Sequence, residues 1–412
     1  MSYTENYQKW LDFAELPAYL RDELVAMDEK TKEDAFYTNL EFGTAGMRGL
    51  IGAGTNRINI YVVRQATEGL AQLIDSKGEE AKKRGVAIAY DSRHFSPEFA
   101  FESAQVLAAH GIKSYVFESL RPTPELSFAV RHLHTFAGIM VTASHNPAPF
   151  NGYKVYGEDG GQMPPADADA LTDYIRAIEN PFTVQLADLE ESKASGLIEV
   201  IGENVDAEYL KEVKGVNINQ DLINEYGRDM KIVYTPLHGT GEMLARRALA
   251  QAGFEAVQVV EAQAVPDADF STVKSPNPES QAAFALAEEL GRKVDADVLV
   301  ATDPDADRLG VEIRHVDIQR QTNLLELHHA LVFPRFLFAL RLLKTVFAVI
   351  HDFADRRRCH GRDLHQIQFL FVRHPLRIPR GHHAQLAAVA VDNANLIVPD
   401  LSIDLQFLTC YG

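Results

Sequence analysis

Short apolar runs alternate with longer amphipathic segments along the first 314 residues of the chain. The apolar runs favour β-strands at 85–90, 112–117, 136–142, 231–235 and 297–302. After the first of them, Ser96 and Pro97 predict the start of a helix that runs to Ala109 and stops at Gly111, because Ser caps free amides and Pro is tolerated in the first turn. This alternation predicts an α/β fold, with successive domains built on parallel or mixed sheets.

A polar stretch around 157–215 separates the two groups of predicted strands. It holds several Gly and Pro residues, followed by an acidic helical segment. We therefore expect a domain boundary near residue 205, with a first domain over 1–205 and a second over 206–314. A chain of 412 residues is long enough for two to four domains, so a single small binding module is excluded.

The composition changes after residue 314. Residues 315–412 hold 9 of the 15 His, both Cys, 10 Arg and one Lys, and their 11 basic and 8 acidic residues give a charge of +3. The preceding residues carry 29 basic and 50 acidic side chains, a charge of −21. The window 330–350 is the most apolar of the tail, but its Pro334 and three basic residues argue against a membrane span. The tail is either a separate domain or the product of an out-of-frame reading.

Composition and charge narrow the class of protein. Hydrophobic residues make up 46% and charged residues 24%, which is typical of a globular protein. The net charge of −18 repels nucleic-acid phosphates and anionic lipids, so neither nucleic acid nor a membrane is an expected partner. The first ten residues show no basic patch followed by an apolar run, and two cysteines form no disulfide framework. We expect a cytoplasmic protein.

Three carboxylates at alternate positions, Asp303, Asp305 and Asp307, directly follow the strand predicted at 297–302. Like charges held this close destabilise a fold unless a cation neutralises them. Oxygen ligands without nearby His or Cys favour Mg²⁺ or Ca²⁺ over zinc. An EF-hand is excluded, because Arg308 and Arg314 occupy the positions that would need Gly and Glu. The alternative is a solvated acidic turn, which would need only one Asp.

Ser144 lies in the segment TASHNP, just after the strand predicted at 136–142. In open α/β sheets this carboxyl end of a strand is where ligands bind, so Ser144 stands where a nucleophile would. The flanking Thr142 and Asn146 exclude the G-x-S-x-G elbow of hydrolases. His145 is not expected to act as a base for Ser144, because adjacent side chains in an extended run point apart. Taken alone, the segment also fits a capping turn.

A glycine-rich segment, GTAGMRG, spans residues 43–49 and continues to Gly52 and Gly54. Its glycines would let backbone amides approach a phosphate, and Arg48 offers a planar fork to the phosphate oxygens. It lacks the Lys-[Ser/Thr] of a P-loop, and a mobile hairpin is an equal interpretation. The segments NGYK at 151–154 and LHGTG at 237–241 are expected to be turns unless the other motifs draw them into a site.

Together, GTAGMRG, TASHNPAPFNGYKVY, TPLHGTG and DPDADR, in this order, resemble the α-D-phosphohexomutases, and among them most closely the bacterial phosphoglucomutases. The resemblance covers residues 1–314. It implies four domains around a cleft, the first three of them α/β, and the reversible conversion of glucose 1-phosphate to glucose 6-phosphate. The implied intermediate is glucose 1,6-bisphosphate, and the implied partner is a small sugar phosphate. Oligomeric state is left open.

The resemblance also implies roles for individual residues. Ser144 would be the phosphoserine, and its phosphate would bind Mg²⁺ together with the three aspartates named above. Arg48 and Arg308, with Ser144 and Asp307, would contact the substrate. His145 and Lys154 match positions near the transferred group, where they would handle protons. Phosphoryl transfer depends mainly on positioning and on neutralising negative oxygens, which such a set of residues provides.

The resemblance ends where the composition changes. After residue 314 there is neither the Gly-Glu-Glu-Ser type sugar-binding loop of the family's third domain nor the phosphate-binding loop of its fourth. We therefore hypothesise a frameshifted or truncated phosphoglucomutase whose residues 315–412 are not the native third domain. Activity is then in doubt, because half of the cleft is missing.

Three other interpretations remain open. A phosphomannomutase or phosphopentomutase would differ only in the sugar. A haloacid-dehalogenase-type phosphatase would use Asp303 as nucleophile, but its fifth motif position is usually Thr or Val, where this chain has Asp307. A catalytically inactive remnant would keep the loops without turnover.

Overall fold

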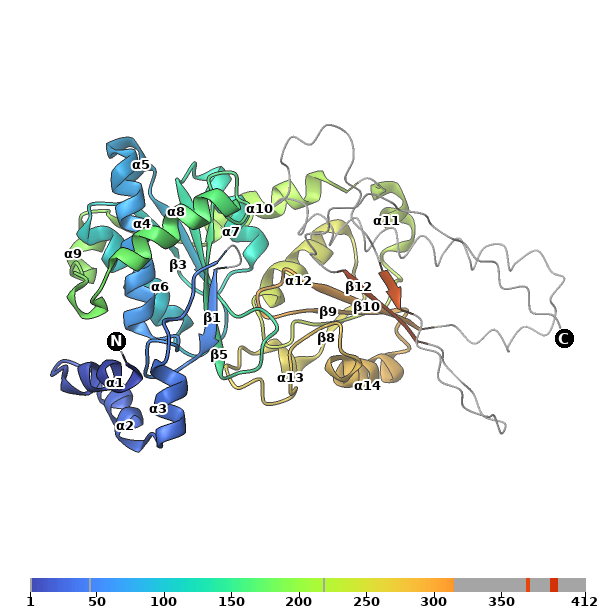
Figure 1. Ribbon diagram of the computed structural model, residues 1–412. Helices are drawn as coiled ribbons and strands as arrows, with labels where there is room; N and C mark the ends of the chain where they lie inside the picture. Colours follow the sequence, from blue (N-terminus) through green and yellow to red (C-terminus); the bar gives the residue numbers. More distant parts are fainter. Residues whose placement is uncertain (1, 44–45, 218, 315–367, 371–385, 392–412) are drawn as a thin grey trace, which may run out of the picture.

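The computed structural model describes residues 2–43, 46–217 and 219–314, and the backbone of two strands at 368–370 and 386–391. The described residues form two α/β units that lie side by side, each built on a six-stranded sheet (Figure 1). The predicted α/β class is confirmed. The apolar window at 330–350 lies outside the described residues. Among the described helices, none has the length and apolar character that a membrane crossing needs.

The first sheet has the strand order β1-β5-β4-β2-β3-β6. Its bounds are β1 Met47–Leu50, β2 Val86–Tyr90, β3 Ser114–Phe117, β4 Ala137–Val141, β5 Phe150–Tyr156 and β6 Ile198–Ile201. Strands β4, β2, β3 and β6 run parallel, β5 is antiparallel to β4, and β1 at the edge is antiparallel to β5. The sheet is therefore mixed, and the three strands predicted for it are β2, β3 and β4.

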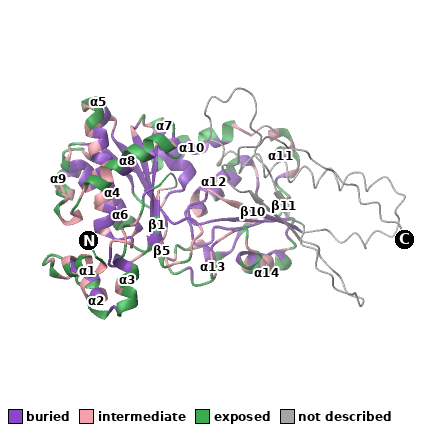
Figure 2. Ribbon diagram, viewed as in Figure 1, coloured by how far each residue is buried: buried purple, intermediate pink, exposed green. Residues whose placement is uncertain are grey.

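Alternate side chains of β2 enter two different cores. Val86 and Ile88 pack into one apolar cluster, while Ala87 and Ala89 pack into another on the opposite face. Figure 2 shows the strands almost wholly buried between helices whose outer sides are exposed. A strand buried on both faces reads as a continuous apolar run, which is why the sequence predicts this element so well.

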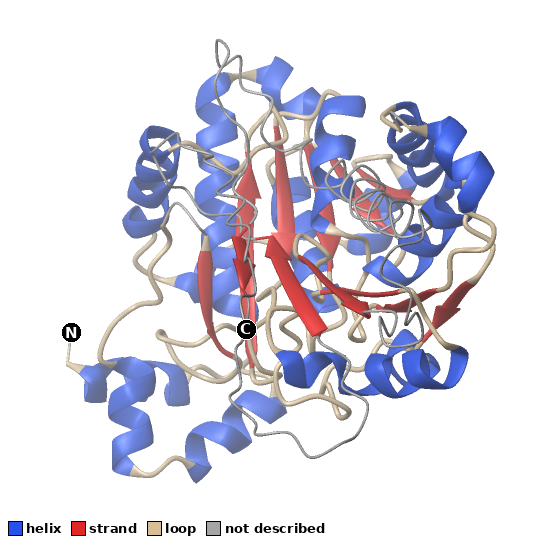
Figure 3. Ribbon diagram, turned by 90° about the vertical axis from the view of Figure 1, so that its right-hand side faces the viewer, coloured by secondary structure: helices blue, strands red, loops and turns tan. Residues whose placement is uncertain are grey.

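Helices cover both faces of the first sheet. The bounds of those between the first and sixth strands are α4 Ile60–Lys77, α5 Glu79–Arg84, α6 Ser96–Ala109, α7 Thr123–His132, α8 Pro165–Ala177, η1 Pro181–Thr183 and α9 Leu189–Ala194. Helices α4, α6 and α8 contribute to the cluster that holds Val86, and α7 to the one that holds Ala87. The sheet and its helices thus form three layers; Figure 3 shows the red strands lying side by side with helices packed around them.

The start of α6 corrects one expectation. The predicted helix spans the expected residues, and Pro97 stands in its first turn. Ser96, however, is the first helical residue and not a cap: its hydroxyl donates to Asp91 at 2.7 Å, and Phe95 before it adopts a left-handed conformation. Gly111, with φ of +69°, follows the helix as predicted.

The polar stretch at 157–215 does more than separate the sheets. It contains β6, a strand that the sequence analysis did not predict, which pairs in parallel with β3 and completes the first sheet. Only two of the four residues of β6 are buried, so the hydrophobic pattern is too weak to predict a strand there. Helix α10 follows (Glu203–Gly215), and the expected boundary at 205 falls inside it.

The second sheet has the order β11-β12-β10-β9-β7-β8. Its bounds are β7 Ile232–Thr235, β8 Val257–Val259, β9 Val298–Thr302, β10 Leu309–Arg314, β11 Gln368–Leu370 and β12 Leu386–Val391. Strands β8, β7 and β9 are parallel and β10 is antiparallel to β9. Its helices are α11 Gln220–Tyr226, α12 Gly241–Ala252, α13 Glu261–Ala264, η2 Gln281–Phe284 and α14 Ala285–Val294. The strands predicted at 231–235 and 297–302 are confirmed.

Helix α12 joins the two units. Leu244 and Ala248 of this helix belong to the apolar cluster that covers one face of the first sheet, together with Tyr209 of α10. Arg247 of the same helix makes a bidentate ion pair with Glu203, with N to O distances of 2.6 and 2.8 Å. The packing fixes the carboxyl ends of β4 and β9 toward each other, and the site lies there.

Three N-terminal helices form a small layer of their own, with bounds α1 Tyr3–Asp12, α2 Ala18–Ala26 and α3 Glu29–Phe36. Ser2 and Glu5 form a capping box that starts α1. Trp10 is buried and makes edge-on ring contacts with Phe36 and with Tyr61 of α4. These contacts attach the helical layer to the first unit.

Candidate active site

Ser144 stands just beyond the carboxyl end of β4, in a loop of residues 142–149 that we call the Ser144 loop. Its side chain is buried, and its Oγ donates a hydrogen bond of 2.7 Å to Oδ2 of Asp303. Its φ of +52° is left-handed, a conformation that costs a non-glycine residue on the order of 1 kcal/mol or more. Such strain persists where the surrounding structure holds the backbone, and it aims the hydroxyl at the second unit.

The three aspartates lie in the Asp loop, residues 303–308, directly after β9. Asp303 and Asp305 are fully buried and Asp307 is partly exposed. One ligand oxygen from each carboxylate lies within 4.8 Å of those of the other two. Burial, together with the carboxylates of Asp305 and Asp307, holds the pKa of Asp303 well above its usual range. The three carboxylates therefore form one cluster, as shared binding of a cation would require, and their role as metal ligands stays a prediction.

Lys154 reaches the Asp loop from β5. Its Nζ lies 2.9 Å from Oδ2 of Asp305 and 3.5 Å from a carboxylate oxygen of Asp307. Burial by itself lowers the pKa of Lys154, but these two carboxylates raise it above its ordinary value, so the side chain is an ammonium. Burial also raises the pKa of Asp305, and the Lys154 charge more than reverses this effect. Segment 151–154 is thus part of β5 and lies beside the Asp loop, which is the alternative to a turn that the sequence analysis left open.

His145 corrects a second expectation. Its Nδ1 lies 3.3 Å from Oγ of Ser144, so the two neighbouring side chains point the same way. The left-handed backbone at Ser144 breaks the extended geometry on which the expectation depended. Burial, with the nearby charges of Arg308 and Arg48, lowers the pKa of His145 to about 4. At neutral pH its ring is uncharged and has a free lone pair to accept a proton.

Two arginines approach from opposite sides. Arg48 on β1 is exposed, and its Nη1 donates to Oδ1 of Asn146 in the Ser144 loop at 2.9 Å. Arg308 closes the Asp loop: its amide donates to Oδ1 of Asp303 at 3.0 Å, and its guanidinium pairs with Glu279 at 2.6 Å. Arg48 thus contacts the Ser144 loop and Arg308 contacts Asp303 of its own loop, while their contact with a substrate stays a prediction.

The two weaker motifs also fall beside the site. Segment 237–241 packs under the Asp loop, where the amide of Thr240 donates to the carbonyl of Pro304 at 2.8 Å. A Cβ at Gly239 would lie 2.5 Å from the Cα of Pro304, so only glycine fits there. In the glycine-rich segment, Gly43 and Gly46 face each other in a bridge before β1, while residues 44 and 45 lie outside the described residues.

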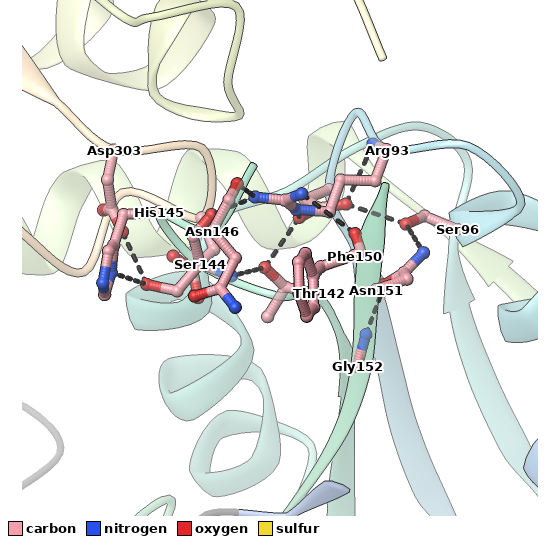
Figure 4. A network of polar contacts seen from close by, with 12 residues as sticks. Arg93, Ser96, Thr142, Ser144, His145, Asn146, Phe150, Asn151, Gly152 and Asp303 are labelled. Carbon is pink, nitrogen blue, oxygen red and sulfur yellow. Dashed lines mark hydrogen bonds and ion pairs between the residues drawn. The ribbon is translucent and has the colours of Figure 1, made fainter. Parts of the chain in front are cut away.

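Arg93 was missed by the sequence analysis. Its buried guanidinium donates to backbone carbonyls of the Ser144 loop, and its Nε lies 3.1 Å from Oδ2 of Asp91 (Figure 4). Asp91 in turn accepts a 2.7 Å hydrogen bond from Thr142. A signal was present, because Asp91 and Arg93 follow β2 at the sheet edge where Ser144 follows β4.

Thr123 was also missed, and no pattern in the sequence marks it. It opens α7, and its amide donates to the carbonyl of Asp305 at 2.9 Å. Its hydroxyl donates to Oδ2 of the same residue at 3.1 Å. The first unit therefore contacts the Asp loop through Ser144, Lys154 and Thr123.

The residues present fit a hard divalent cation. Oδ1 of Asp305 is buried and has no hydrogen-bond partner among the described residues, so this carboxylate oxygen can still serve as a ligand. Three carboxylates and a hydroxyl provide only oxygen ligands, the set that Mg²⁺ prefers. A single ammonium cannot neutralise three buried or half-buried carboxylates, so the cluster retains negative charge for a cation to balance.

Comparison with known proteins agrees with this arrangement. The sequence model described as phosphoglucomutase/phosphomannomutase, alpha/beta/alpha domain I, matches residues 39–182, and the one for domain II of the same family matches residues 207–315. The phosphoglucomutase of Staphylococcus epidermidis is 40% identical over 309 residues, which are 75% of this chain and 55% of that protein. The phosphoglucomutase of Staphylococcus aureus is 40% identical over 281 residues, or 68% of this chain and 49% of that protein.

Solved structures show the same fold. A protein of Thermus thermophilus, provisionally named a phosphomannomutase, superposes with a TM-score of 0.56 at 26% identity, covering 66% of this chain and 57% of that one. A phosphoglucomutase/phosphomannomutase family protein of Burkholderia thailandensis superposes with a TM-score of 0.51 at 23% identity, covering 66% and 54%.

The chain belongs to the phosphoglucomutase/phosphomannomutase family, one branch of the α-D-phosphohexomutases. The phosphoglucomutase of Staphylococcus saprophyticus is also similar, with 39% identity over 298 residues. The chain spans about half the length of these relatives.

Proposed function

We propose that the chain carries the phosphoryl-transfer half of a phosphoglucomutase, with Ser144 as the residue that stores the phosphoryl group. The observation that carries this proposal is the 2.7 Å hydrogen bond between Oγ of Ser144 and Asp303, across two separate units of the fold. A serine hydroxyl needs only one hydrogen-bond partner, so a purely structural Ser144 would not explain three nearby carboxylates. A phosphoserine that shares a divalent cation with those carboxylates would explain them.

The reaction then conserves every atom of the sugar phosphate. The O6 hydroxyl of glucose 1-phosphate attacks the phosphorus of phosphorylated Ser144; the O6–P bond forms, the P–Oγ bond breaks, and the O6 proton leaves to a base. Glucose 1,6-bisphosphate turns over in the cleft. Ser144 Oγ then attacks the phosphorus at C1, that P–O1 bond breaks, and O1 takes up the proton. The net change is an isomerisation to glucose 6-phosphate.

The side chains around Ser144 suit these steps. Ser144 and the three aspartates would hold Mg²⁺, which would supply positive charge against the oxygens of the transferring group. Lys154, kept charged by Asp305, places a second cation beside the same group. The ring of His145, 3.3 Å from Ser144 Oγ, is close enough to exchange a proton with the transferring group. We assign Arg48 and Arg308 to the phosphate of the bound sugar.

The phosphatase interpretation is not favoured by this geometry. Asp303 would have to attack as a carboxylate, but its Oδ2 accepts the hydrogen bond from Ser144 and its Oδ1 accepts the amide of Arg308. Both oxygens of Asp303 are therefore engaged within the site.

The domain limits remain part of the proposal. We assign residues 1–205 to the unit that bears Ser144, 206–314 to the unit that bears the Asp loop, and 315–412 to a segment foreign to the family. The change of composition at 315 supports the last assignment. Reading the coding DNA in the other two frames beyond the codon for Arg314 tests it: a Gly-Glu-Glu-Ser type sugar loop should appear in one of them, and its absence from both would remove the frameshift hypothesis.

Two measurements on one preparation test the function. The protein is incubated with Mg²⁺ and glucose 1,6-bisphosphate labelled in its phosphates, and label on Ser144 is located by peptide mass spectrometry; conversion of glucose 1-phosphate is followed in parallel. Label on Ser144 that vanishes in Ser144→Ala supports the proposal, with or without turnover. Label without turnover identifies an incomplete mutase; no label at all contradicts the proposal. Replacing the sugar by mannose or ribose phosphates decides specificity if turnover is seen.

A further inference from the structure

The guanidinium of Arg93 is enclosed by the backbone of a single loop. Its Nη2 donates to the carbonyls of Ser144 and Asn146 at 2.6 and 2.5 Å, and its Nη1 donates to those of Pro147 and Phe150, both at 2.9 Å. The Arg93 side chain is fully buried. Figure 4 shows these carbonyls turned toward the guanidinium from both sides. One side chain thus fixes four peptide groups within seven consecutive residues.

Asp91 fixes the guanidinium and the other side of Ser144 at the same time. Its Oδ2 lies 3.1 Å from Nε of Arg93 and accepts a 2.7 Å hydrogen bond from Thr142. The hydroxyl oxygen of Thr142 then accepts the amide of Ser144 at 2.8 Å. Both the amide and the carbonyl of Ser144 are therefore tied to the Asp91–Arg93 pair, which also stabilises its left-handed backbone.

We infer that Arg93 is a positioning residue for Ser144: it shapes the Ser144 loop so that the hydroxyl faces Asp303. The expected effect of Arg93 on phosphoryl transfer rests on the proposed function. Its effect on the shape of the Ser144 loop does not depend on that function. Arg93 touches none of the reacting atoms, because its Nη1 and Nη2 donate to backbone carbonyls and its Nε lies beside Asp91. Its charge is balanced by Asp91, so it adds little attraction for a phosphate.

The geometry of the guanidinium explains why arginine is needed. Its donors are spread over a rigid plane, so they reach carbonyls on two sides at once. A lysine ammonium is a single point with three donors and cannot span four acceptors arranged in this way. The Arg93→Lys variant therefore keeps the charge beside Asp91 and loses the shape of the loop. Misplacing a reacting atom by about 1 Å costs roughly 100-fold in rate, so a loosened loop should slow transfer strongly.

The test compares Arg93→Lys with Arg84→Lys in the full chain. Arg84 also bridges two backbone carbonyls, those of His134 and Thr135 at 2.9 and 3.0 Å, but at the amino ends of β2 and β4, away from Ser144. Three quantities are measured on each: amide hydrogen exchange of residues 142–150, the dissociation constant for Mg²⁺, and the single-turnover rate of label transfer from glucose 1,6-bisphosphate to Ser144.

For Arg93→Lys we expect faster exchange confined to residues 142–150, a Mg²⁺ dissociation constant within about twofold of wild type, and transfer slowed by about 10- to 100-fold. Arg84→Lys should leave exchange there and transfer unchanged. Unaltered exchange in the loop overturns the inference, and so does faster exchange with wild-type transfer. A fall in Mg²⁺ affinity and in protection across the whole sheet would assign Arg93 a general structural role and also overturn it.

Failure of the proposed function has a different signature. If the wild-type protein takes up no label, the function fails, and the inference is then judged by the exchange of residues 142–150 alone. If Arg93→Lys does not fold, Asp91→Asn replaces it, since this variant retains Arg93 and removes the carboxylate that orients it. The same confined loss of protection is expected, and full protection of the loop would overturn the inference.

Discussion

The ammonium of Lys154 lies 2.9 Å from Oδ2 of Asp305, a residue 151 positions later in the chain. The first residue belongs to a strand of the first unit and the second to the Asp loop of the second unit. Both side chains are almost fully buried, so the pair is a charged contact that neither unit could satisfy alone. The two units are therefore joined at the site itself, as well as through the packing of α12.

Breaking this pair should weaken the fold. Lys154→Met keeps the volume of the side chain but leaves Asp305 and Asp307 without their ammonium, and the loss of one partner from a buried pair costs about 3–5 kcal/mol. The free energy of unfolding should fall by about this amount when it is measured by urea denaturation, with EDTA present to remove divalent cations. Lys113→Met removes a more exposed pair with Glu199 and should change it by less than about 1 kcal/mol. Equal effects of the two substitutions would contradict this account of Lys154.

Mg²⁺ should stabilise the protein through the Asp loop. A ligand that binds only the folded state at about 100 times its dissociation constant adds about 2.7 kcal/mol, so saturating Mg²⁺ should raise the melting temperature by several degrees. Asp303→Asn removes a carboxylate from the cluster and should abolish most of this rise. Asp221→Asn, at an exposed helical position, should preserve it. A rise of equal size in all three proteins would show that the cation acts elsewhere.

Thr123 should contribute to metal affinity without touching the cation. Its hydroxyl donates to Oδ2 of Asp305, while the opposite oxygen, Oδ1, has no partner among the described residues. Thr123→Val removes the hydroxyl at nearly constant volume and lets the carboxylate turn, so we expect the Mg²⁺ dissociation constant, measured by calorimetry, to rise by about 10-fold, as for other groups that orient metal ligands. Thr123→Ser should restore it. If the valine variant binds as tightly as wild type, Thr123 serves only to start α7.

The stability of the first unit should depend on pH through His110. A hydrogen bond with Glu68, opposed by burial and aided by Asp75, raises the pKa of His110 to about 9. Because the folded pKa is raised, the contribution is fully present below the unfolded value of about 6.5 and is lost as pH rises through 9. The loss should amount to about 2 kcal/mol, allowing for solvent screening of a half-buried group.

Urea unfolding at pH 6.5 and pH 9.5 measures this loss. In wild type the free energy of unfolding should fall between the two, and His110→Gln should show a smaller fall, since glutamine does not titrate. Parallel pH dependences in the two proteins would mean that the charge of His110 contributes nothing.

The buried strands were predictable because both of their faces are covered. Val86, Ile88 and their neighbours form continuous apolar runs, which the pattern identifies to within two residues at each end. Strand β6 was not predictable, since Glu199 and Val200 at its centre are exposed and it has a neighbour on one side only. Strand β5 was missed for another reason: Asn151 and Gly152 at its start are typical of turns, yet here they pair with β1.

The site was predictable where its residues are chemically unusual. Three aspartates at alternate positions and a serine after an apolar strand indicate function from local sequence. Arg93 and Thr123 carry no such mark, because they act on the backbone or on another side chain across the fold. The orientation of His145 depends on one left-handed residue, Ser144, and no pattern of side chains reports a backbone angle.

The central claim is that Ser144 and the Asp loop bind one divalent cation between them. Crystals of the protein soaked in Mn²⁺, a substitute for Mg²⁺ with an anomalous signal, test it most directly. The account predicts one strong anomalous peak about 2.1 Å from oxygens of Asp303, Asp305 and Asp307 and of Ser144 or its phosphate. A cation bound elsewhere on the protein, or an empty cluster with Ser144 turned away from Asp303, would contradict it.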